Sequence, residues 1–161
     1  MSDRLEQVLV SLRRVIRATD LHSKHLAKTS GLTAPQILLL QAIRKLEGAA
    51  VGHLAKEVSL SQATVTSILD RLEKKGYIKR ERSLVDKRKV HVQLTEYGVE
   101  ILKEAPQPLQ AEFSNQFNEL QEWEQTMIIA ALQRVAFMMD AEHIDASPVL
   151  DVGALDRVST I

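Results

Sequence analysis

The amino-acid sequence predicts a mostly α-helical fold with a small β-wing: a winged helix-turn-helix with N- and C-terminal dimerisation helices. Two observations carry this prediction. Between residues 53 and 98, two segments with the apolar spacing of amphipathic helices precede two basic segments with the alternation of strands. On either side, residues 3–28 and 95–141 carry apolar stripes at helical spacing. Each element is justified in turn below.

The two helices of the helix-turn-helix are predicted at residues 51–58 and 61–75. Gly76 follows the second helix, where a left-handed residue commonly ends a helix. Ser61 is suited to be its N-cap, although a direct contact to DNA is an equally good interpretation of this hydroxyl. One face of the second helix is apolar and should be buried; it carries Val65, Ile68, Leu69 and Leu72.

A β-hairpin is predicted next, with one strand over residues 77–82 and the return strand over residues 89–94. In the return strand Val90, Val92 and Leu94 alternate with polar residues, His91 among them, which predicts one buried and one outward face. Helix, turn, helix and a basic hairpin together are typical of a module that binds duplex DNA.

The charge distribution supports a DNA-binding interpretation. Residues 53–95 carry ten Lys and Arg against five Asp and Glu, whereas residues 96–161 carry three against twelve. Contacts to bases and phosphates are therefore expected from the second helix and from the hairpin with its flank. The helix candidates are Ser61, Gln62, Ala63, Thr64, Thr66, Ser67 and Arg71. The wing and flank candidates are Lys74, Lys79, Arg82, Asp86, Lys87, Arg88 and Lys89.

The segment SQATVTSILDRLEKKGYIKRERSLVDKRKVHVQLTEYG resembles the MarR-type transcriptional regulators. The shared features are a hydroxyl-rich helix ending in LEKKG, the Asp86-Lys87-Arg88 tip and the Leu-Thr-Glu-x-Gly that restarts a helix. The resemblance implies a homodimer that binds double-stranded DNA, with the arginine matching Arg88 in or beside the minor groove. It also implies a small-molecule effector, in a crevice lined by the first, second and fifth helices. Asp86 is placed to hold the Arg88 side chain extended.

The first helix, over residues 3–28, has an apolar seam that needs a partner. Residues 33–46 should form a second helix, opened by a capping box of Thr33 and Gln36 and apolar over most of its surface. We expect the terminal helices to pair with their copies across a two-fold axis, so that the operator is an imperfect palindrome. The dimerisation candidates are Leu5, Leu9, Leu12, Ile16, Leu132 and Val135.

Thr95 should cap a helix after the wing, and Pro106 and Pro108 predict a kink in it near Ala105. A last helix is expected over residues 122–141. Its Met and aromatic stripe, which includes Trp123 and Met127, is interpreted as core. The tail has no helical period, and it should be either disordered or an arm over the partner subunit.

Other classes of function are disfavoured. The chain contains no cysteine and no apolar run long enough to span a membrane, so a cytoplasmic protein with no membrane partner is expected. No metal or cofactor is expected, because His22 and His25, three apart, form no recognised ligand pattern. No catalytic motif is visible, and we do not expect an enzyme. The alternative is a winged-helix dimer that acts as a protein-interaction module without binding DNA.

Four regions are predicted. Residues 1–30 form an N-terminal dimerisation helix, and residues 31–98 the winged helix-turn-helix DNA-binding domain. Residues 99–141 form the C-terminal dimerisation helices, and residues 142–161 the tail. The expected function is that of a sequence-specific transcriptional regulator, a ligand-responsive repressor that binds a palindromic operator.

Overall fold

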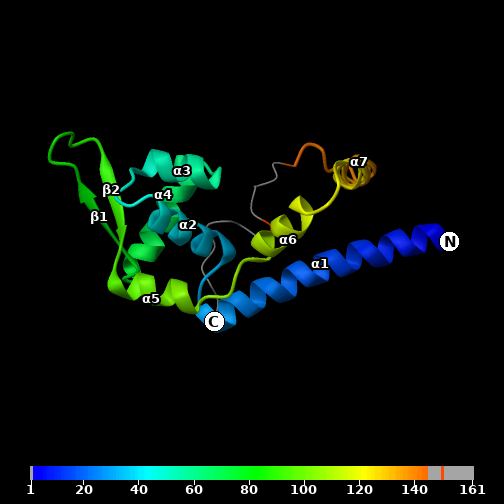
Figure 1. Cartoon of the computed structure of the whole chain (residues 1–161), viewed down its shortest axis with the longest axis horizontal. Coiled ribbons are helices and arrows are strands. Elements are labelled where there is room, and N and C mark those ends of the chain that lie inside the picture. The colour runs from blue at the N-terminus through cyan, green and yellow to red at the C-terminus, as the bar shows by residue number, and fades with distance from the viewer. Residues whose placement is uncertain (1, 145–149, 151–161) are drawn as a thin grey trace.

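The computed structural model describes residues 2–144 and 150, and it confirms the predicted fold class (Figure 1). Helices dominate, and the two strands form a small antiparallel sheet. In chain order the elements are α1 (Asp3–Ser30), α2 (Ala34–Lys45), α3 (Val51–Val58), α4 (Gln62–Lys74), β1 (Ile78–Arg82), β2 (Val90–Leu94), α5 (Glu96–Glu104), α6 (Leu109–Asn118) and α7 (Glu122–Met138).

The core lies inside the winged helix-turn-helix, where α2, α3 and α4 meet the hairpin. The central helix is α2, as its composition predicted. It begins with the predicted capping box, in which Thr33 and Gln36 exchange side-chain and backbone hydrogen bonds. The predicted apolar face of α4 is fully buried against it. The largest buried side chains include Ile37, Leu39, Leu40, Leu54, Ile68, Leu69 and Leu72.

The sheet pairs Ile78 with Leu94 and Arg82 with Val90, and a short bridge extends it at one edge. His91 pairs with Ala50 in this bridge, just before α3. Its Nδ1 lies 2.6 Å from the carbonyl oxygen of Gly48, so this nitrogen donates the hydrogen bond. The predicted alternation holds, with Val92 buried, and this contact to the loop before α3 leaves His91 half-buried rather than fully exposed.

The junction between the wing and α5 explains the glycine of the Leu-Thr-Glu-x-Gly motif. The hydroxyl of Thr95 accepts a hydrogen bond from the Gly98 amide at 3.0 Å, as predicted for an N-cap. It also donates to the carbonyl oxygen of Gly76 at 2.6 Å. Gly98 is buried against Tyr77, and a Cβ at this position would lie 2.0 Å from the Tyr77 carbonyl oxygen. Only glycine fits this contact.

The helix after the wing is broken, not kinked as predicted. It stops at Glu104, and α6 begins only at Leu109. Ala105 has an extended backbone, with φ −67° and ψ 134°. The cause is Pro106, whose ring disfavours helical geometry in the preceding residue. The last helix also ends at Met138, earlier than the predicted Ala141.

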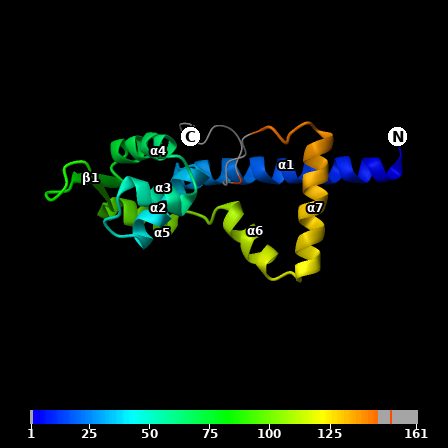
Figure 2. The ribbon, with the colours of Figure 1, turned by 90° about the horizontal axis from the view of Figure 1, so that it is seen from above.

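Helix α1 extends away from the winged helix-turn-helix, and α7 lies at a distance from that core (Figures 1 and 2). Both helices expose large apolar side chains in the single chain. Ile16 is 63% exposed, Trp123 63% and Leu132 57%. The interpretation of the α7 stripe as core is therefore wrong for one chain alone. None of the described helices combines the length and the apolarity needed to cross a membrane.

Candidate nucleic-acid interface

Helix α4, the second helix of the helix-turn-helix, presents a polar first turn to solvent. Ser61 is its N-cap: the Oγ atom accepts a hydrogen bond from the Thr64 amide at 3.1 Å and donates one to the Thr64 hydroxyl at 2.9 Å. Gln62, Ala63 and Thr66 are exposed, whereas Thr64 and Ser67 are half-buried. The exposed face therefore carries the small side chains that allow a helix to approach a groove closely.

Arg71 is less available than the sequence suggests. Its side chain is half-buried, and within the described part of the chain its Nη1 atom is buried without a hydrogen-bond partner. A buried donor without an acceptor is unfavourable. The prediction that Arg71 contacts DNA therefore requires its guanidinium group to leave this position.

The wing is held against α4 by ion pairs that the sequence did not predict. The Arg80 guanidinium donates to Asp70 at 2.6 Å and to Glu73 at 2.8 Å. The hydrogen bond to Glu73, with that to Asp70, raises the pKa of Arg80. Asp70 and Glu73 are three residues apart on α4 and therefore lie on the same face. This spacing was the only sign in the sequence that the two carboxylates could share one partner. These pairs fix the hairpin relative to α4 and occupy the Arg80 guanidinium, which is then less available to a phosphate.

Two further lysines of the basic segment also have partners in the chain. The Lys75 ammonium donates to the carbonyl oxygen of Gly31, at the end of α1, at 2.9 Å. Burial lowers the pKa of Lys75. Lys79 lies 3.5 Å from a carboxylate oxygen of Glu81. Lys75 therefore links α1 to α4, whereas Lys79 is exposed and can exchange a weak surface pair for a phosphate.

The loop at the tip of the wing is ordered by side-chain caps. The Ser83 hydroxyl accepts hydrogen bonds from the Val85 and Asp86 amides, both at 3.2 Å. A carboxylate oxygen of Asp86 accepts the Arg88 amide at 3.0 Å. Asp86 therefore holds Arg88 as predicted in position, but through the Arg88 backbone amide and not through its guanidinium group, and so it shapes the turn.

Most of the predicted wing cations are free to meet a polyanion. They are exposed, and none of them forms an ion pair within residues 2–144. Together with Lys74 at the end of α4, we call them the wing cations. The members are Lys74, Arg82, Lys87, Arg88 and Lys89.

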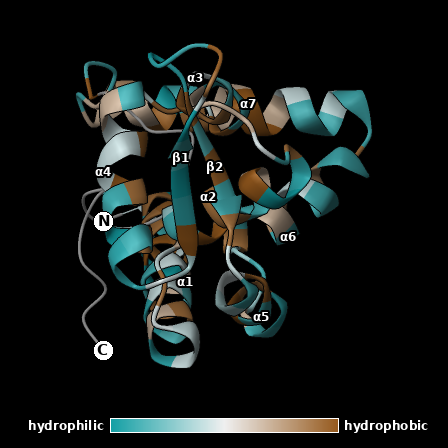
Figure 3. Cartoon of the chain, turned by 90° about the vertical axis from the view of Figure 1, so that its left-hand side faces the viewer, coloured by the Kyte–Doolittle hydropathy of each residue, from teal (hydrophilic) through white to brown (hydrophobic). Residues whose placement is uncertain are grey.

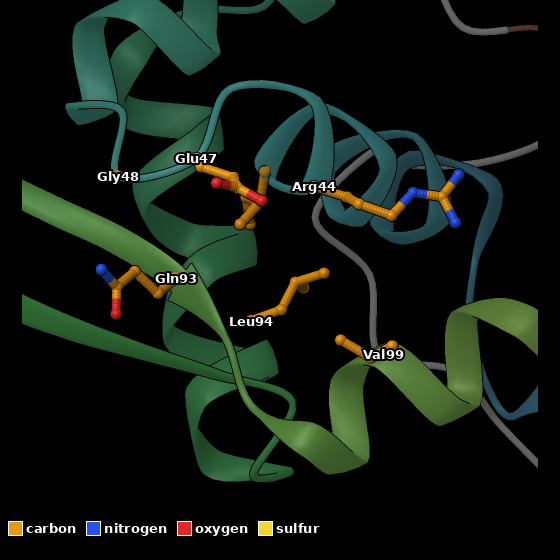
Figure 4. Close-up of a pocket in the computed structure, with 7 residues that line it drawn as sticks. Arg44, Glu47, Gly48, Gln93, Leu94 and Val99 are labelled. Atoms are coloured by element: carbon orange, nitrogen blue, oxygen red, sulfur yellow. The ribbon is translucent and has the colours of Figure 1, made fainter.

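A pocket of about 330 Å³ opens at the base of the wing. It is lined by α2, the loop after α2, β2 and the start of α5 (Figure 4). The resemblance implied a crevice lined by the first, second and fifth helices. This pocket uses α2 and α5, but strand β2 takes the place of the first helix. Its lining residues are Ile43, Arg44, Glu47, Gly48, Gln93, Leu94 and Val99.

Of the two histidines on α1, His22 has a structural contact. Its Nε2 atom lies 2.9 Å from the carbonyl oxygen of Gln107. This contact joins α1 to the segment between α5 and α6. Among the described residues, no group of His, Asp and Glu side chains is arranged to hold a metal ion.

A winged helix-turn-helix with a free basic hairpin defines a class of transcriptional regulators, and comparison with known proteins specifies the family. The MarR family model matches residues 32–90. SarZ, an HTH-type transcriptional regulator from Staphylococcus epidermidis, is 36% identical over 101 residues, which cover 63% of this chain and 68% of SarZ. The chain spans half the length of the SarZ protein from Staphylococcus haemolyticus. The chain belongs to the MarR family.

Solved structures agree with this assignment. A mutant of MarR from E. coli, complexed with operator DNA, is 25% identical, with a TM-score of 0.55 over 83% of this chain and 96% of MarR. BpsR from Bordetella bronchiseptica, whose DNA binding is regulated by 6-hydroxynicotinic acid, is 27% identical, with a TM-score of 0.51 over 81% of this chain and 98% of BpsR. These relatives are regulators of transcription and not enzymes.

Proposed function

We propose that this protein is a homodimeric, sequence-specific DNA-binding regulator that represses transcription by binding a palindromic operator. The observation that carries the proposal is the set of wing cations beside the exposed face of α4. Cations without an ion-pair partner among the described residues are available to phosphates, and they belong to the wing and to the end of the helix that has the shape to enter the major groove. A protein-interaction module without DNA binding would have no need of this group.

In this proposal the two elements have different roles. Gln62, Thr64 and Thr66 on α4 contact base edges and supply specificity, whereas the wing cations contact phosphates and supply affinity. Ser61 can contact DNA only with the hydrogen-bonding capacity of its hydroxyl that the N-cap hydrogen bonds leave unused. Asp86 acts indirectly, through the turn that presents Arg88.

The first prediction concerns Arg88. Arg88→Ala should weaken DNA binding by about 1–3 kcal/mol and reduce the salt slope of binding by about 1, because one phosphate-proximal cation is lost. Fluorescence anisotropy with a labelled duplex, repeated over a range of salt, measures both quantities. Lys103→Ala, which removes an exposed cation from α5, is the matched control and should change neither. An unchanged affinity for Arg88→Ala at physiological salt would rule out the proposed wing contact.

The second prediction separates affinity from specificity. Selection of random duplexes by the wild type and by variants gives a preferred sequence for each protein. Gln62→Ala and Thr66→Ala should change the preferred bases, whereas Lys74→Ala and Lys87→Ala should weaken binding to all duplexes equally. The opposite pattern would show that α4 is not the reading helix. Failure of the wild type to enrich any duplex would favour the interaction-module alternative.

The exposed apolar surface supports a two-fold dimer through residues 1–30 and 99–141, with residues 31–98 as the DNA-binding unit. Leu5, Val15 and Ile16 on α1 and Leu132 on α7 are between 48% and 63% exposed, more than isolated surface positions require. Leu9, Leu12 and Val135 are half-buried beside them. The role predicted for residues 142–161 falls mostly outside the described residues.

A small-molecule effector is the remaining part of the proposal. The pocket at the base of the wing supports it, because its walls belong to α2, β2 and α5, and a ligand there would alter how the wing sits on the core. The regulation of BpsR by 6-hydroxynicotinic acid is a precedent in a relative. The genes that adjoin the selected operator would indicate which compounds to test for displacement of the protein from DNA.

A further inference from the structure

The tip of the wing carries two apolar side chains that no contact within the described part of the chain explains. Leu84 is 100% exposed and Val85 is 98% exposed, the highest values among the exposed large apolar residues of the described chain. They lie at the end of the hairpin that projects furthest from the body (Figure 1). Figure 3 shows a short hydrophobic stretch in the loop that joins β1 and β2. Neither side chain stabilises the fold, so folding does not account for their presence.

The loop that carries them is shaped by specific hydrogen bonds. The Ser83 hydroxyl accepts two amides, those of Val85 and Asp86, and Asp86 in turn accepts the amide of Arg88. The turn is closed by the Ser83 amide, which donates to the Lys89 carbonyl oxygen at 2.9 Å, and by the Lys89 amide, which donates to the Asp86 carbonyl oxygen at 3.0 Å. The apolar pair is therefore presented on an ordered turn, and presenting it in a complex costs little conformational entropy.

The charges around the pair indicate what it contacts. Four of the wing cations, Arg82, Lys87, Arg88 and Lys89, lie within the hairpin on either side of it. The acidic side chain of the loop, Asp86, is half-buried and occupied by the turn. An apolar pair between exposed cations fits a surface with apolar walls between two rows of phosphates. The minor groove of DNA, with its sugar walls and flanking phosphates, has this pattern.

We propose that Leu84 and Val85 enter the minor groove of the operator beside the major groove that α4 occupies, and contact its sugars and base edges. This inference rests on the proposed function and extends it, because it adds an apolar contact to the ionic contacts of the wing. It also assigns the wing a part in specificity. The exocyclic amino group of guanine projects into the minor groove, so an apolar tip favours A·T over G·C pairs at its position.

The experiment compares the double variant Leu84→Ser/Val85→Ser with the wild type on the duplex that the wild type selects. Because both side chains are fully exposed in the free protein, the variant should fold with unchanged thermal stability. Its affinity should fall by about tenfold, with an unchanged salt slope, since apolar contacts and no phosphate contacts are lost. Leu84→Met/Val85→Ile, which keeps the tip apolar, should retain wild-type affinity.

A base-pair series tests where the pair lies. Replacing the A·T pairs in the minor groove that flanks the α4 site by G·C should weaken the wild type, and replacing them by inosine·C should restore it, because inosine lacks the exocyclic amino group. The double serine variant should respond less to both changes. Equal affinity of this variant and the wild type on all three duplexes would overturn the inference while leaving the proposed function intact.

Two other outcomes also decide the question. A salt slope reduced as much as in Arg88→Ala would show that the tip affects phosphates only, which contradicts an apolar contact. Wild-type binding to vesicles of phosphatidylglycerol and phosphatidylcholine, lost in the double serine variant while DNA affinity is unchanged, would assign the tip to a lipid surface instead. If the wild type binds no duplex at all, the proposed function is wrong, and the inference that rests on it is wrong with it.

Discussion

Ile16→Glu is expected to convert the dimer to a monomer and to lower operator affinity by 10²-fold or more. Ile16 is 63% exposed in the single chain, so a carboxylate there should not disturb the folding of the protomer. In the proposed dimer the same side chain is buried. Burying such a side chain is worth roughly 1.5–3 kcal/mol, and a buried unpaired charge costs more. A monomer has one reading head and loses the effective-concentration gain of the second half-site.

Light scattering gives the mass, circular dichroism the helix content, and anisotropy the affinity for a full and a half palindrome. Ala18→Glu is the matched control, because Ala18 is exposed on α1 away from the apolar seam and the added charge is the same. Leu132→Glu makes the same test from α7, where the residue is 57% exposed. A dimeric Ile16→Glu protein with wild-type affinity would contradict the assignment of α1 to the interface.

Gly98→Ala should destabilise the winged helix-turn-helix by about 2 kcal/mol or more and loosen the wing. The added Cβ would lie 2.0 Å from the Tyr77 carbonyl oxygen and 2.9 Å from its carbonyl carbon, and backbone atoms can yield only by moving the hairpin away from α5. This strain outweighs the gain in helix propensity from glycine to alanine, which is about 1 kcal/mol. Chemical denaturation measures the change in the free energy of unfolding.

Gly52→Ala is the matched control. Gly52 lies in α3, where an added Cβ would come no closer than 3.4 Å to the Gln62 side chain, an ordinary contact. This substitution should be neutral or stabilising, by up to about 1 kcal/mol, because only the helix propensity changes. Equal stability of the two variants would mean that the contact of Gly98 with Tyr77 does not constrain the wing.

Local patterns were sufficient to predict the elements of the winged helix-turn-helix. Each of these patterns depends on residues within a few positions of one another. They are the capping box of Thr33 and Gln36, the N-caps Ser61 and Thr95, and the alternation of Val90, Val92 and Leu94. The proline pair marked a disruption after α5, but its extent was underestimated. Pro106 disfavours helical geometry at Ala105, and a helix resumes only after Pro108.

Sequence by itself determined the fold class, the buried face of α4 and the basic character of the hairpin, because apolar periodicity and charge are properties of the order of residues. Only the tertiary structure decided which charges remain available. Arg80 pairs with Asp70 and Glu73, Lys75 caps the end of α1, and His91 holds the loop before α3. Each of these partners lies outside the element that carries the residue it binds, at a sequence distance that no local pattern encodes. The free cations of the wing are those to which the fold brings no partner from residues 2–144.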